Sequence, residues 1–182
     1  EENHWKQIQE QVAAIDTLDE LKRFRTLQQI TQKETRARQA EKPKPKLPYR
    51  QFYSQSGLKI WVGRDAKTND KLTFHLANGR DWWFHVSGCA GSHVILHLES
   101  QKDPDENAVL DAAQLALVYS KLHKEGKGDI IVTQKKHLQR ADKNKPGEVL
   151  VSKHKIRQIS LDERRLQQIK QRTFERRKGI RS

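Results

Sequence analysis

Residues 81–97 read DWWFHVSGCAGSHVILH, and the predicted fold is centred on this stretch. Four potential metal ligands recur in it at every fourth position: His85, Cys89, His93 and His97. A helix would place residues at that spacing on one face. Gly88 and Gly91 interrupt such a helix, however, and the valine and isoleucine residues on either side favour strands. The sequence therefore predicts two strands, 81–86 and 93–98, joined by a loop.

A metal site or a reactive thiol in this hairpin is disfavoured. Structural zinc sites usually pair cysteines as Cys-x₂-Cys, whereas Cys89 is the one cysteine in the chain. Cys89 with a neighbouring histidine would give a nucleophilic thiolate, but a lone cysteine in a glycine-rich loop more often fills space. We therefore predict no metal and no cofactor.

The polar side chains of the hairpin have two further interpretations. Side chains alternate along a strand, so Asp81, Trp83 and His85 share one face of the first strand. Asp81 could orient the imidazole of His85 or His93 for acid–base catalysis, or the histidines could be hydrogen-bonded in a polar core. Trp82 and Trp83 point to opposite faces. One indole is thus expected in the core and the other on the surface, where it could stack on a base or a sugar.

The segments around the hairpin predict an α+β domain built mainly on an antiparallel sheet. Further strands are expected at 49–53, 58–62, 129–134, 149–152 and 156–161. One long helix, 108–124, is apolar over most of its surface, which indicates burial against the sheet. One short helix is expected to begin at Asn69 or Asp70 and to run to Leu76.

The two ends of the chain are charged and helical in pattern. Residues 1–41 have the spaced apolar residues of a helical hairpin or a coiled coil, which could self-associate. Residues 42–48, with the sequence KPKPKLP, predict an extended Lys/Pro linker. The domain would then cover 49–161, and 162–182 would form a basic C-terminal helix or tail.

The composition favours a polyanionic partner. The formal net charge is +13, and residues 46–159 carry nineteen basic against twelve acidic residues, so much of the excess lies on the domain. No apolar run reaches the roughly 18–20 residues of a membrane helix, and no signal-peptide core opens the chain. With a single cysteine, these features predict a cytoplasmic location and no membrane partner. The absence of methionine indicates a piece of a longer protein or a trimmed chain.

A set of short motifs occurs in the order typical of one known domain. The motifs are SGLKIWVGR at 56–64, Asn69-Asp70-x-Leu72-Thr73, Asp81-x-Trp83-x-His85, Gly91-Ser92-His93-Val94, Ala112-Ala113 with Tyr119-Ser120, and Lys145-Pro146-Gly147-x-Val149. Each motif alone is weak, but together they cover about residues 49–160. In this combination the sequence resembles the NFACT-R domain, which lies at the C-terminal end of NFACT-family ribosome quality-control factors.

The resemblance implies a non-enzymatic RNA-binding module that acts on large ribosomal subunits carrying stalled peptidyl-tRNA. Its expected partners are tRNA, rRNA or both, and the large ribosomal subunit. The polar residues shared with the family are candidates for an RNA-facing site or for organising the core: Arg64, Asn69, Asp81, Trp83, His85, Ser92 and His93. A more specific pocket is expected from Arg64, Trp83, His85 and His93. Cys89 and His97 lie outside the family pattern.

Basic residues crowd the last predicted strands and their loop. Four of them are expected to contact phosphates: Lys135, Lys136, Arg140 and Lys145. The alternative is a solvated charged face. The arginine-rich C-terminal segment could add RNA contacts or be disordered. Two other functions stay open at this point: a phosphodiesterase that uses Asp81, His85 and His93, and a protein-interaction module that works through residues 1–40.

Overall fold

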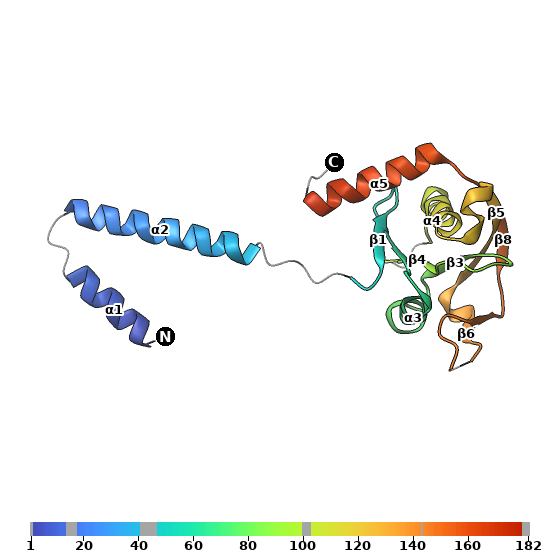
Figure 1. Cartoon of the computed structure of the whole chain (residues 1–182), viewed down its shortest axis with the longest axis horizontal. Coiled ribbons are helices and arrows are strands. Elements are labelled where there is room, and N and C mark those ends of the chain that lie inside the picture. Colours follow the sequence, from blue (N-terminus) through green and yellow to red (C-terminus); the bar gives the residue numbers. More distant parts are fainter. Residues whose placement is uncertain (1, 14–17, 41–46, 100–102, 143, 180–182) are drawn as a thin grey trace. The chain divides into compact units, whose positions relative to one another are not determined.

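The computed structural model describes residues 2–13, 18–40, 47–99, 103–142 and 144–179. The chain divides into two compact units, Glu1–Lys46 and Leu47–Ser182. The first unit contains two helices, α1 (Glu2–Ala13) and α2 (Leu18–Ala40), which confirms the helical N-terminal segment (Figure 1). Most of the predicted Lys/Pro linker lies outside the described residues.

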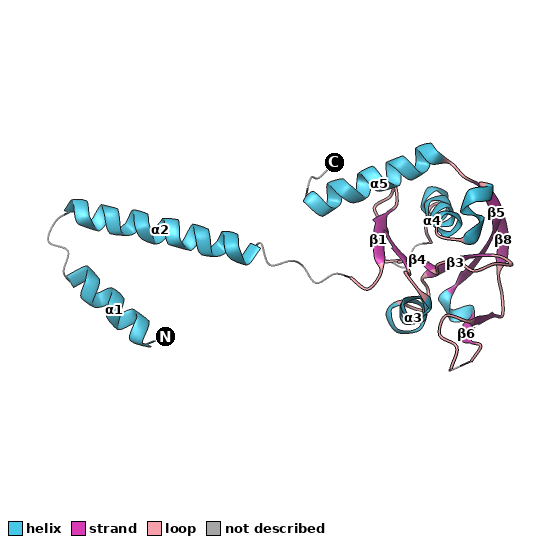
Figure 2. Cartoon of the chain, viewed as in Figure 1, coloured by secondary structure: helices cyan, strands magenta, loops and turns pink. Residues whose placement is uncertain are grey.

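The second unit is built on an antiparallel sheet of six strands in the order β1-β2-β4-β3-β5-β8. Their bounds are β1 (Arg50–Tyr53), β2 (Lys59–Val62), β4 (Val94–Leu96), β3 (Trp82–Val86), β5 (Lys127–Gln134) and β8 (Lys155–Ser160). Two further strands, β6 (Leu138–Arg140) and β7 (Val149–Val151), pair separately. The α+β fold class is confirmed (Figure 2). The sequence did not predict β6, a strand of three residues.

One face of the sheet packs on the long helix α4 (Glu106–Val118). Alanines of α4 are fully buried, so the helix approaches the sheet closely. The helix ends earlier than the predicted Lys124, because Tyr119 departs from helical geometry and a 3₁₀ turn, Lys121–Glu125, follows. The Ser120 side chain caps this turn by accepting a hydrogen bond from the backbone N–H of Leu122.

The other face of the sheet is covered by α3 (Ala66–Lys71), the π-helical turn Leu72–Leu76 and the β6–β7 hairpin (Figure 1). Trp61 and Trp83 form the centre of the apolar core on this side. The predicted start of the short helix at Asn69 or Asp70 is wrong. Asp65 is the N-cap, and it exchanges side-chain and backbone hydrogen bonds with Thr68 in a capping box.

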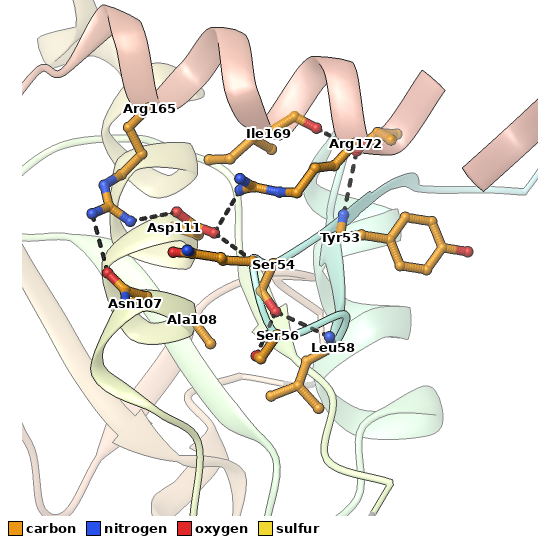
Figure 3. A network of polar contacts seen from close by, with 12 residues as sticks. Tyr53, Ser54, Ser56, Leu58, Asn107, Ala108, Asp111, Arg165, Ile169 and Arg172 are labelled. Atoms are coloured by element: carbon orange, nitrogen blue, oxygen red, sulfur yellow. Dashed lines mark hydrogen bonds and ion pairs between the residues drawn. The ribbon is translucent and has the colours of Figure 1, made fainter. Parts of the chain in front are cut away.

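The C-terminal helix α5 (Glu163–Lys178) packs on α4 and β1. Ile169 is fully buried, and the Thr173 hydroxyl accepts a hydrogen bond from the backbone N–H of Tyr53 at 3.3 Å. Asp111 of α4 is completely buried and accepts hydrogen bonds from Arg165 at 2.7 Å and Arg172 at 2.8 Å (Figure 3). This clamp fixes α5 on the domain and leaves the helix's outer face in solvent.

Candidate functional site

A pocket of about 580 Å³ opens beside the end of β2. Its walls come from α3, the β3–β4 loop, the turn after α4 and the loop before β7. Five of the predicted site residues line it: Arg64, Asn69, His85, Ser92 and His93. Pro146 and Gly147, from another of the sequence motifs, close its far side. Positions spread over more than eighty residues of sequence therefore meet in one place.

The pairing of β3 with β4 places residues that are equally far from Cys89 in sequence opposite one another. Trp83 lies opposite Ile95 in the antiparallel register, so the hairpin is symmetric about Cys89. His85 therefore faces His93, and their ring centroids are 5.4 Å apart.

His93 is a buried, neutral member of the pocket. Its ring Nδ1 lies 2.8 Å from the Thr73 hydroxyl, and its backbone N–H donates to Asn69 Oδ1 at 3.1 Å. Burial, and to a smaller extent the neighbouring His85, lower the pKa of His93 to about 3. Burial also lowers the pKa of His85. Both imidazoles are thus neutral near pH 7, so they offer hydrogen bonds rather than positive charge.

Trp83 supports the pocket from inside the core. The side chain is fully buried, stacks on His85 at 5.5 Å and meets His93 edge-on at 5.0 Å. It therefore presents no face to a ligand. Trp82, the partly exposed member of the pair, instead lines a separate groove of about 340 Å³ together with Lys136, Lys153 and Lys155 among others.

Asp81 does not join His85 or His93. Its buried carboxylate accepts a hydrogen bond from the backbone N–H of Leu98 and lies 3.0 Å from His97 Nδ1. His97 in turn stacks on Trp61 at 4.5 Å. The acid–base set of Asp81, His85 and His93 is therefore not assembled. The sequence did not indicate His97 as the partner of Asp81, because His97 lies outside the family pattern. The symmetry of the hairpin nevertheless places it opposite Asp81.

Backbone contacts hold the polar wall of the pocket. A Cβ atom at Gly63 would lie 1.9 Å from Asn69 Oδ1, so glycine is required for the asparagine to reach His93. The Ser92 hydroxyl donates to the Gly63 carbonyl at 2.8 Å. The side chains of Asn69 and Ser92 are thus hydrogen-bonded to backbone groups of the pocket wall and hold it in shape.

The four predicted phosphate contacts do not line this pocket. Arg140 makes a bidentate pair with Asp70, at 2.9 and 2.8 Å, and lies over the ring of Phe74. This pair lowers the pKa of Asp70 and ties β6 to α3. Lys136 belongs to the Trp82 groove, Lys145 is exposed and lies 4.0 Å from Glu148, and Lys135 is half-buried.

Among the described residues, no three His, Cys, Asp or Glu side chains form a group that could hold a metal ion. Cys89 is half-buried, and its thiol contacts the carbonyl of Ala90 at 3.7 Å. None of the helices in the described ranges is long and apolar enough to span a membrane.

Known proteins resemble a large part of this chain. The Rqc2 homolog RqcH of Bacillus subtilis (strain 168) is 33% identical over 108 residues, which cover 59% of this chain and 18% of that protein. The Rqc2 homolog RqcH of Streptococcus pneumoniae (strain D39) is 29% identical over 136 residues, covering 74% and 24%. The chain therefore spans about a fifth to a quarter of the length of these curated relatives.

A solved structure has a similar fold. It is the C-terminal part of the fibronectin/fibrinogen-binding protein from Streptococcus suis, with a TM-score of 0.62 and 28% identity. The match covers 71% of this chain and 51% of that one. The family model described as the NFACT protein RNA binding domain matches residues 48–153. The chain therefore belongs to the NFACT family, and its second unit contains the family's RNA-binding domain.

Proposed function

We propose that this domain binds tRNA, rRNA or both for an NFACT-type factor that acts on stalled large ribosomal subunits. Such a factor would work in the cytoplasm, where it meets ribosomes. One observation carries the proposal: five residues of the family's polar set converge on one pocket, in a domain whose family is described as RNA-binding.

The pocket has the size and chemistry for an unstacked nucleotide. Its volume of about 580 Å³ lies within the usual range for small-ligand sites. Arg64 and Lys121 are exposed cations in its lining, suited to phosphate oxygens. His85 is neutral and can exchange a hydrogen bond with a base edge, which is how proteins read single-stranded RNA.

The remaining predicted residues take supporting or peripheral roles in this proposal. Asp81, Trp83 and His93 hold the hairpin and His85 in position from inside. Lys136, with Lys135 and Lys145, adds attraction for phosphates at some distance from the pocket. The guanidinium of Arg140 is occupied by Asp70, so we assign it a smaller share of RNA binding.

The proposed role is binding without catalysis. A carboxylate that orients an imidazole would favour a phosphodiesterase, but Asp81 contacts His97 instead of a pocket histidine. Prolonged incubation of the chain with labelled tRNA, with and without divalent metal ions, should leave the RNA intact. Cleavage that is lost in His85→Ala while the fold persists would contradict the non-enzymatic role.

Fluorescence polarisation with labelled tRNA tests the proposal. We expect micromolar or tighter binding that weakens steeply between about 50 and 200 mM salt. Lys121→Gln should weaken binding, whereas Lys124→Gln should not, because both are exposed on the same 3₁₀ turn but Lys121 alone lines the pocket. No binding at low salt would overturn the proposal, and equal losses in the two variants would overturn the assignment to the pocket.

A further inference from the structure

A third hollow, of about 350 Å³, lies between β1 and α5. Four cationic side chains line it together with two aromatic rings and a threonine: Arg50, Arg64, Lys170, Arg177, Phe52, Phe174 and Thr173. No carboxylate occurs among these lining residues. We call this hollow the β1–α5 groove. The match to the family's RNA-binding domain ends at residue 153, so four of the seven lining residues, all on α5, lie beyond it.

The groove is a fixed feature of the fold. Asp111 binds Arg165 and Arg172 of α5 from one side (Figure 3). Near the other end of the helix, Arg177 donates a hydrogen bond to the backbone carbonyl of Gln51 at 3.0 Å. The cations of α5 are therefore held at a set position relative to β1, which lowers the entropy cost of binding an anion there.

The groove and the pocket adjoin. Arg64 lines both hollows. Arg50, of the groove, lies over the ring of Tyr119, of the pocket, at 4.8 Å. A strand of RNA with a nucleotide in the pocket can therefore continue into the groove past Arg64.

Phe174 gives the groove a second kind of contact. Its side chain is 51% exposed although phenylalanine is apolar. It lies in the lining with Lys170 and Arg177, and Lys178 is placed over its ring at 4.5 Å. An exposed aromatic ring among cations is the arrangement with which proteins bind single strands, because bases stack on the ring while the cations contact phosphates.

We propose that the β1–α5 groove binds the single-stranded RNA segment next to the nucleotide held in the pocket, so that α5 is part of the RNA-binding surface. Lys170, Arg64 and Arg50 contact its phosphates, and Phe174 stacks on a base. This inference rests on the proposed function, because it extends the same RNA track.

Binding of two RNA lengths to the full chain tests the inference. A single strand of about three nucleotides should fill the pocket, whereas one of about twelve should also occupy the groove. Lys170→Gln should lower the salt slope for the long RNA by about 0.7, the value for one lost phosphate contact on a single strand. Phe174→Ala should weaken the affinity for the long RNA about fivefold. Neither change should affect the short RNA.

Arg164→Gln is the matched control, because Arg164 is an exposed cation on the same helix but does not line the groove. Its affinities should equal those of the unmodified chain. If both RNAs bind but Lys170→Gln leaves the long RNA unaffected, or if Arg164→Gln has the same effect, the groove is not an RNA site and the pocket proposal still stands. If the unmodified chain binds neither RNA, both proposals fail.

Discussion

Replacing Asp111 with alanine tests how α5 is held on the domain. The buried carboxylate accepts hydrogen bonds from Arg165 at 2.7 Å, Arg172 at 2.8 Å and the backbone N–H of Gln55 at 3.0 Å. Removing one partner of a buried ion pair costs about 3–5 kcal/mol. We expect the lower end, about 3 kcal/mol, because the arginine side chains are 23% and 24% exposed and can turn toward water.

Urea denaturation of the full chain measures this loss. With a urea dependence of about 1–3 kcal/mol per M, the midpoint should fall by roughly 1–3 M in Asp111→Ala. Trypsin should also cleave α5 faster, because the helix would open locally before the sheet unfolds. The control is Asp129→Ala, which removes an exposed carboxylate from β5 and should leave the midpoint unchanged. A midpoint for Asp111→Ala within about 0.2 M of the unmodified chain would refute the assignment of the clamp.

Three further predictions concern the pocket and its surroundings. Because the folded pKa of His93 is about 3, below the usual 6.5, its contribution to stability is complete above pH 6.5 and falls as pH drops. The loss should reach about 2 kcal/mol at pH 5, and urea midpoints of His93→Gln should show a weaker pH dependence over that interval. Gly63→Ala should displace Asn69 from His93, because the added Cβ would collide with Asn69 Oδ1. We expect the free energy of unfolding to fall by about 1–3 kcal/mol and RNA binding to weaken. Unchanged urea midpoints and an unchanged RNA affinity would contradict this. Lys136→Gln should reduce the salt slope of tRNA binding by about 0.7–0.9, and Arg140→Gln by less, since Asp70 already occupies its guanidinium; equal reductions would contradict this.

The sequence predicted the central hairpin well because local rules determine it. The aromatic and β-branched residues of the two strands and the glycines of the loop between them are visible without knowing the rest of the fold. The predicted start of the short helix was wrong, and the reason is also local. Asn69 and Asp70 are good N-caps, but the Asp65-x-x-Thr68 capping box begins the helix four residues earlier than the first of them.

Long-range partners explain the other differences. Arg140 and Asp70 are seventy residues apart in sequence, and nothing in the basic run around Arg140 indicates that its side chain is engaged. The contact of Asp81 with His97 depends on the register of two strands, which periodicity alone leaves open. The C-terminal helix α5 is highly charged, so the sequence did not indicate that one narrow face of it is buried. That face consists of Leu166, Ile169 and Thr173.

The most direct test of RNA binding at the pocket is crosslinking of 4-thiouridine-substituted tRNA to the full chain, with the attached peptides located by mass spectrometry. We expect crosslinks in the peptides that contain Arg64, His85 and Lys121, which line the pocket. Lys121→Gln should reduce them more than Lys124→Gln. Crosslinks confined to the groove around Lys136, Lys153 and Lys155, with none at the pocket, would contradict it.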